Sequence, residues 1–156
     1  MFQPLDLASL SLTPTLDTSA HTSGNVLFVP SKLQDAVQNG KGGAFLRSVL
    51  ILDGANQKAA IDLLFFNQNP GSIGAVNTAL NISAAQLAML VGILSVATGD
   101  YATLKAATNA VGQTKAADLP LITIATSKDL WVAGVARGTP TYLATSLTLK
   151  FNVERH

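Results

Sequence analysis

The chain has 156 residues, of which 12% are charged, none is Cys, and two are His, namely His21 and His156. This length predicts a single domain covering residues 1–156. The lack of Cys excludes disulfides and zinc–thiolate sites. The net charge is +1 and the basic residues are scattered along the chain, which argues against the clustered basic face typical of nucleic-acid binding.

The apolar content is high for a soluble monomer, with 48% hydrophobic residues and a mean hydropathy of +0.35. Either the core is rich in Ala and Leu, or partners cover part of the apolar surface. Residues 1–6 lack the basic and apolar regions of a signal peptide. The longest apolar stretch, Leu87 to Val96, is far shorter than the ~20 residues that span a bilayer. We therefore expect a protein made in the cytoplasm, with no membrane partner.

Residues 5–16 show the alternation of a strand. Leu10 and Leu12 are separated and followed by serine and threonine, so apolar and polar side chains fall on opposite faces. Pro14 cannot donate a hydrogen bond to a neighbouring strand, which predicts that this strand ends there or lies at a sheet edge. Residues 1–16 are therefore expected to form an N-terminal arm or an edge strand.

The next segment predicts a short strand followed by turns. Val26 to Val29 is apolar, and Pro30 is expected to stop it. Residues 31–37 form either one helical turn or irregular chain. The Gly40-x-Gly42-Gly43 sequence predicts a loop; it lacks the spacing of a dinucleotide-binding motif and precedes a strand, so we expect no cofactor there.

Residues 44–53 give the clearest strand, and a turn then leads to residues 60–66, which are expected to return as a hairpin. Both faces of residues 60–66 are apolar apart from Asp62, which indicates a central strand buried on both sides. A buried carboxylate requires a partner, and the hairpin register makes Arg47 the nearest candidate for a structural ion pair.

The middle of the chain contains a long loop and a capped helix. Residues 67–81 are expected to be mostly loop, and Ser83-Ala84-Ala85-Gln86 has the form of a capping box. We place a short helix at Ala84 to Leu90 and a strand at Ile93 to Val96. Residues 101–115 are ambiguous, because Ala favours helix whereas Thr, Asn and Gly favour loop or weak strand.

Two further strands, Leu121 to Ala125 and Leu130 to Ala136, are expected to form a second hairpin. Alternating apolar residues from Leu147 to Val153 give a last strand with one wet face. The sum is about eight short strands with turns between them and one short helix. This pattern predicts a mainly β fold, an antiparallel β-sandwich or jelly-roll-like domain in which paired terminal strands hold the chain ends.

Few residues offer catalytic chemistry. His21 lies in a turn, where we expect it to be solvated, and no nucleophile motif accompanies it. The carboxylates considered are spread along the chain, namely Asp53, Asp62, Asp100, Asp118 and Asp129. Several of them lie in turns, where Asp stabilises the backbone. We therefore expect no catalytic residue, no metal site, no cofactor and no enzymatic activity.

Aromatic residues leave two alternatives open. Trp131 is either a core anchor or an interface anchor, since Trp is enriched at binding hot spots. A carbohydrate- or receptor-binding module would need exposed aromatics near loop tips, for which Tyr101 and Tyr142 are the candidates.

Several segments, spread over nearly the whole chain, resemble small virion structural proteins of tailed bacteriophages. They are residues 6–10 and 13–20, the Ala60-Ile61-Asp62-Leu63-Leu64-Phe65-Phe66 strand, residues 93–101 and residues 136–141. The resemblance implies a β-sandwich-like fold and a place in the phage particle, with no active site. It favours a capsid cement or decoration protein on the capsid surface; the alternatives are a tail, connector or fibre-anchoring component, or the binding module above.

A cement protein must bury surface against the major capsid protein and against its own copies. These are the partners we expect, as a homo-oligomer at local symmetry axes. The leucine-rich N-terminal segment is suited to adding a strand to a neighbour's edge. The candidate interface residues are Leu5, Leu7, Leu10, Leu12, Trp131 and Tyr142.

Overall fold

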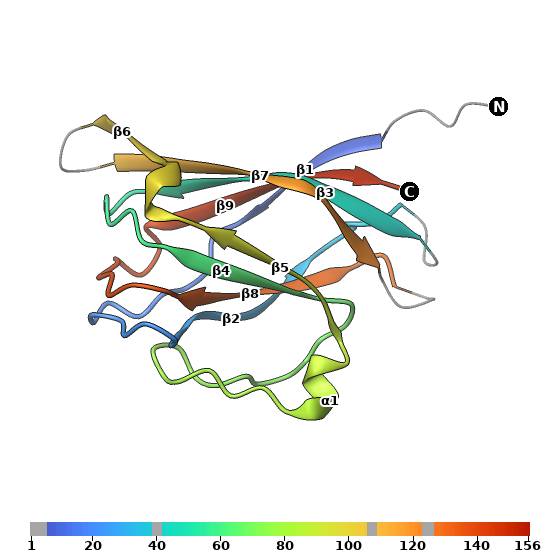
Figure 1. The fold of residues 1–156 in the computed structure, drawn as a ribbon, viewed down its shortest axis with the longest axis horizontal. Helices are drawn as coiled ribbons and strands as arrows, with labels where there is room; N and C mark the ends of the chain where they lie inside the picture. The colour runs from blue at the N-terminus through green and yellow to red at the C-terminus, as the bar shows by residue number, and fades with distance from the viewer. Residues whose placement is uncertain (1–5, 39–41, 106–108, 123–126) are drawn as a thin grey trace.

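The computed structural model describes residues 6–38, 42–105, 109–122 and 127–156, and its strands form two antiparallel sheets (Figure 1). The five-stranded sheet has the order β1 (Asp6–Leu12), β9 (Leu147–Arg155), β3 (Gly43–Asp53), β7 (Asn109–Ile122) and β6 (Tyr101–Lys105). The four-stranded sheet has the order β2 (Val26–Leu33), β8 (Leu130–Ala136), β4 (Ile61–Phe66) and β5 (Leu90–Val96). Two short helical turns, α1 (Ala84–Leu87) and η1 (Thr98–Asp100), flank β5.

The strand order is that of a jelly-roll. With β6 set aside as an added edge, the order β1-β9-β3-β7 faces the order β2-β8-β4-β5. The chain crosses between the sheets at every connection except those from β4 to β5 and from β6 to β7, which gives two interlocked Greek keys. The expected mainly β, jelly-roll-like sandwich is therefore confirmed. The terminal strands also pair with each other, from Asp6 opposite Arg155 to Leu12 opposite Leu149.

The main core lies between the sheets. The inward residues of β9 are all buried there, and their polar neighbours on the same strand point to the outer face. Phe151 of β9 packs edge-on against Phe65 of β4, with ring centroids 5.9 Å apart. Interior strands of the two opposite sheets are thus in direct contact through these aromatic rings.

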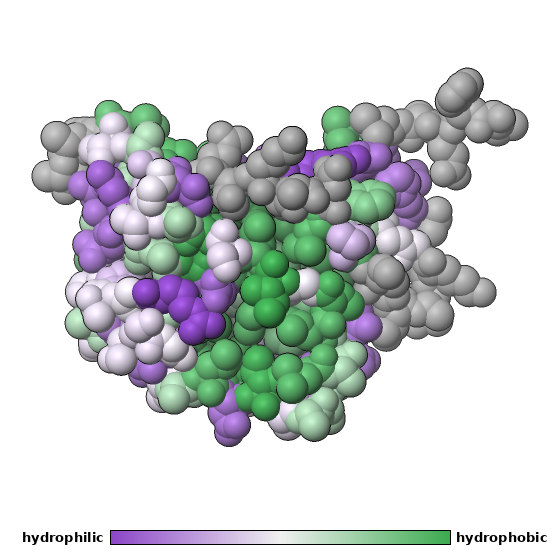
Figure 2. Space-filling view, in the orientation of Figure 1, coloured by the Kyte–Doolittle hydropathy of each residue, from purple (hydrophilic) through white to green (hydrophobic). Residues whose placement is uncertain are grey.

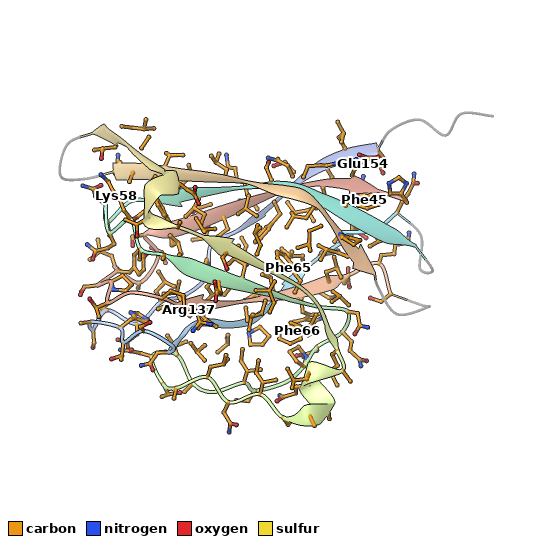
Figure 3. The ribbon with its side chains drawn as sticks, viewed as in Figure 1. Phe45, Lys58, Phe65, Phe66, Arg137 and Glu154 are labelled. Atoms are coloured by element: carbon orange, nitrogen blue, oxygen red, sulfur yellow. The ribbon has the colours of Figure 1, made fainter. Side chains whose placement is uncertain are left out.

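A second apolar core covers the outer face of the four-stranded sheet. β4 alternates between the two cores, since Phe65 belongs to the main one and Phe66 to the second. In Figure 3 the two labelled rings diverge from β4, and the segment of residues 67–89 lies on the Phe66 side. Trp131 of β8 packs in the second core. The expected central strand, apolar on both faces, is therefore confirmed for β4.

β2 runs further than the sequence indicated. It continues through Pro30 to Leu33, where a helical turn or irregular chain was the expectation. The physical reason is that β2 is an edge strand, with β8 on one side only, so a residue without an N–H can be accommodated there. The register with β8 is irregular between Val26 and Ser31.

Both expected hairpins are wrong. β3 and β4 lie in different sheets, and so do β7 and β8, because the turns between them carry the chain across the sandwich instead of reversing it within one sheet. Residues 123–126 of the second expected hairpin lie outside the described residues. β3 pairs instead with β7 and β9, which are distant in sequence, and local turn signals do not report such pairings.

The remaining elements resolve the ambiguous middle of the chain. The capping box is present, with Gln86 N–H donating to Ser83 Oγ at 3.3 Å and Ser83 N–H donating to Gln86 Oε1 at 2.9 Å. The helix ends at Leu87 and not at Leu90, because Leu90 pairs with Phe66 as the start of β5. Residues 101–105 are strand β6 and residues 109–115 belong to strand β7, and the residues between them lie outside the described ranges.

Candidate interaction surfaces

Two of the turn aspartates support the backbone. The Asp53 carboxylate is 1% exposed and accepts the backbone N–H groups of Ala55 at 3.0 Å and Lys58 at 2.8 Å. Asp100 accepts the backbone N–H of Ala97 at 2.8 Å. Both carboxylates are engaged by the turns that contain them, as expected for Asp at such positions.

The ion pair expected between Asp62 and Arg47 does not form. Asp62 accepts from Arg137 Nε at 2.6 Å and from the Ser95 hydroxyl at 2.6 Å, on the outer face of the four-stranded sheet. Arg47 donates to Glu154 Oε2 on β9 through Nε at 2.8 Å, in the other sheet. The prediction was wrong because it assumed the β3–β4 hairpin, although a structural role for Asp62 is what its contacts indicate.

The two histidines have structural surroundings. His21 is 2% exposed, contrary to the expected solvated turn, and its Nδ1 lies 3.3 Å from the Pro140 carbonyl oxygen. Its ring meets Tyr142 edge-on at 6.4 Å. His156 directly follows β9, and there its N–H donates to the Gly43 carbonyl at 3.0 Å and its Nε2 lies 3.3 Å from Glu154 Oε1.

Within the described residues, no group of three His, Asp or Glu side chains could hold a metal ion. The side chain of Asp118 and the Gly40 part of the glycine-rich loop lie outside the described part of the chain. No helix in the described ranges is long and apolar enough to cross a membrane.

The candidate interface residues divide into two groups. Leu7 is 64% exposed, whereas Leu10 and Leu12 are half-buried and pack against the main core. Leu5 lies outside the described residues. β1 is an edge strand, with β9 as its neighbour, so these residues follow one rim of the five-stranded sheet.

The two aromatic candidates are less available. Tyr142 is 1% exposed and belongs to the main core, where burial raises the pKa of its hydroxyl above the ordinary range. Tyr142 is therefore removed from the surface candidates. Trp131 is half-buried in the second core, so its core role is confirmed while its role in an interface stays a prediction.

Sequence reasoning missed a second surface, which we call the uncharged face. It is formed by β5 and by the segment of residues 67–89, which includes α1 and lies over the second core. Leu87 is 54% exposed and Ile93 is 51% exposed, and Met89 and Leu90 beside them are half-buried. Figure 2 shows apolar residues gathered on this side of the molecule, over β5 and the chain next to α1.

Hydrogen bonds hold this face in place. Gln86 Nε2 donates to the Pro70 and Ser72 carbonyls, each at 2.8 Å, so the helix-capping residue also ties α1 to the loop. At the β2 end, Val26 N–H donates to the Thr78 carbonyl and Asn77 N–H to the Val26 carbonyl, both at 2.8 Å. Leu87 and Ile93 therefore belong to a surface whose backbone is held in place by these hydrogen bonds.

The sequence signal for this face is the absence of charge. Residues 63–99 contain no Asp, Glu, Lys, Arg or His, a long interval for a surface segment. Hydrophobic periodicity does not reveal it, because the apolar residues of a loop that covers a sheet follow neither a helix nor a strand period. The Asp62–Arg137 pair lies at its border, where Arg137 is labelled in Figure 3.

Comparison with known protein families gives no match, and comparison with curated proteins gives none. Among solved structures, the chain is similar to one in the X-ray structure of tomato aspermy virus, with 8% identity and a TM-score of 0.43, over 99% of this chain and 78% of that chain. It is also similar to a chain of desmodium yellow mottle tymovirus, with 11% identity and a TM-score of 0.29, over 99% and 83% of the two chains. Both TM-scores are below 0.5, so the fold assignment rests on the strand order and not on these similarities.

Proposed function

We propose that this protein is a structural component of a virus particle and, more specifically, a cement or decoration protein on the capsid surface of a tailed phage. It binds the major capsid protein and copies of itself. A jelly-roll is compatible with this role but does not decide it, since viral capsid proteins, lectins and cupins share the architecture.

The observation that carries the proposal is the uncharged face. Leu87 and Ile93 are about half-exposed on chain that hydrogen bonds hold in place. Apolar side chains grouped in this way are typical of a surface that contacts a partner and not of one that faces water. The described carboxylates Asp53, Asp62 and Asp100 are engaged in structural contacts, which favours binding over catalysis. The burial of Tyr142 removes one of the two aromatics on which a carbohydrate-binding module would depend.

The copy number of the chain in purified particles tests the proposal, measured by quantitative mass spectrometry against the major capsid protein. A ratio near one, or a simple fraction of it, is expected for a cement protein. About a dozen copies or fewer would assign the chain to the tail or connector. Complete absence would overturn the structural role.

The Ile93→Lys variant tests the face itself. A lysine on an exposed strand position is expected to change the free energy of unfolding by no more than about 0.5 kcal/mol, because its side chain reaches water. It places a charge inside the contact surface, where desolvation opposes binding, so incorporation into particles is expected to fall severalfold. Thr145→Lys, on an exposed turn, is the matched control; equal incorporation of both variants would contradict a role for the uncharged face.

A further inference from the structure

The sandwich has four edge strands, and three of them carry features that hinder pairing with another chain. β2 contains Pro30 and Lys32 and has two register irregularities. β6 has five residues and a register shift against β7. β5 lies against β7 of the opposite sheet, whose Leu119 and Leu121 pack over Gly92. Prolines, lysines, bulges and covered edges are the usual protection of exposed strands.

β1 has none of this protection. It pairs with β9 along seven residues without a register shift, and its sequence contains no Pro, Gly, Lys or Arg. Its one charged residue, Asp6, is bonded to Arg155 Nη2 at 2.8 Å. Among the described residues, no strand pairs with its outer edge. That edge therefore offers a row of backbone donors and acceptors to a partner strand.

We propose that β1 pairs antiparallel with β1 of a second copy of this chain, around a two-fold axis at Ser9. This inference rests on the proposed function, because it names the self-contact of a particle protein and its register. Ser9 lies opposite Ser9 of the other copy, Leu7 opposite Ser11, and Ala8 opposite Leu10. The two five-stranded sheets become one continuous sheet across the axis.

The burial pattern of β1 suits this register. A two-fold axis perpendicular to the sheet places the same face of both copies on the same side. Leu7, Ser9 and Ser11 are exposed on the outer face, and Ala8, Leu10 and Leu12 are half-buried on the inner face. Each inner residue meets another inner residue, so the partner covers the apolar sides that the open edge leaves half-buried.

Charge supports a copy of the same chain as the occupant. Asp6 lies opposite Leu12 in this register, so the two Asp6 carboxylates are about 20 Å apart along the strands, beyond the Debye length of ~8 Å in physiological salt. Arg155 also neutralises each of them. Two identical edges therefore meet without like charges in contact, which is the condition that a self-pairing edge has to satisfy.

Cysteine cross-linking of the purified full chain tests the register, because the chain contains no natural Cys. Paired Cα atoms in antiparallel strands are about 4.5–5.5 Å apart, within the range that a disulfide spans. Ser9→Cys is therefore expected to form a disulfide dimer on mild oxidation. Ser11→Cys is the matched control, exposed on the same strand but about 13 Å from its own copy. We expect dimer formation on the order of tenfold faster or more for Ser9→Cys, through the higher effective concentration of its thiols.

Mixing two different cysteine variants tests which residues lie opposite each other. Leu7→Cys and Ser11→Cys chains are expected to cross-link when mixed, and much more slowly when either is oxidised alone. Equal rates for Ser9→Cys and Ser11→Cys would overturn the proposal, and so would a chain that light scattering shows to be monomeric up to millimolar concentration. Failure of the proposed function is a separate result, because absence from particles leaves the cross-linking of the pure chain unchanged.

Discussion

The outer faces of the two sheets are built in different ways. The five-stranded sheet turns polar and charged side chains outward, including the Arg47–Glu154 pair. Figure 3 labels Glu154 beside Phe45 on this sheet. The four-stranded sheet turns Leu64, Phe66 and Val135 outward and covers them with the segment of residues 67–89.

The outer face of the five-stranded sheet is polar and contacts water, whereas the outer face of the four-stranded sheet is apolar and is covered by another segment of the chain. The covering segment buries Phe66, but Leu87 of the segment itself and Ile93 of the neighbouring strand β5 remain about half-exposed. The outer surface on this side of the molecule is therefore still partly apolar. The uncharged face is therefore the outer surface of the layer that covers the four-stranded sheet, together with the exposed part of β5.

The largest expected effect concerns the second core. Phe66 is fully buried under the covering segment, and Phe65 is fully buried between the sheets. If both layers are parts of one cooperative fold, Phe66→Ala and Phe65→Ala each lower the free energy of unfolding by about 3–5 kcal/mol. Urea denaturation followed by circular dichroism measures both. A loss below about 1 kcal/mol for Phe66→Ala alone would show that the cover is a loosely held addition.

The same contrast explains which features the sequence predicts. Alternation over residues 147–153 and the apolar faces of β4 predicted strands correctly, because one or both sides of those strands are buried and burial sets the period. The hairpins were wrong, because a turn such as Asp53 to Lys58 looks the same whether the chain reverses in one sheet or crosses to the other. The predicted partner of Asp62 was wrong for the same reason, since its actual partner, Arg137, is distant in sequence.

The candidate surfaces show a similar division. Leu7 was named as an interface candidate on a strand that Pro14 placed at a sheet edge, and the structure leaves it exposed on the edge strand β1. Tyr142 was misplaced, since nearby turn residues suggested a surface position although its ring fills the core beside His21. Ile93 was not singled out, because its exposure depends on where the covering segment ends, and no local pattern reports that.

A smaller effect is expected on the inner side of β8, where the sandwich tolerates no added volume. A Cβ at Gly134 would lie 2.3 Å from a ring carbon of Phe28, which is itself buried. Gly134→Ala is expected to lower the free energy of unfolding by about 1–3 kcal/mol through overpacking. At Gly138, just after β8, a Cβ would meet nothing within 4 Å, so Gly138→Ala serves as the control. Equal chemical denaturation midpoints for the two variants would mean that Phe28 can move aside.

The smallest effect concerns the charged end of the four-stranded sheet, away from its uncharged face. Asp129 accepts from Lys32 Nζ at 2.7 Å and from the Asp35 N–H at 2.9 Å. Burial acts to raise the pKa of Asp129, but the hydrogen bonds from Lys32 and Asp35, with the Lys32 charge, outweigh it and lower the pKa below its ordinary value of 3.8.

Because the folded-state pKa of Asp129 lies below the unfolded one, this group stabilises the fold at pH values above 3.8, and the contribution is lost as the pH falls through the folded-state pKa. Lys32 is half-exposed, so the pair contributes only a few tenths of a kcal/mol, about 0.5 at most. Asp129→Asn is therefore expected to be slightly less stable than the natural chain in urea at pH 7 and to approach it at pH 3. A deficit of the same size at both pH values would assign the effect to the lost geometry of the Asp35 turn, not to the charge.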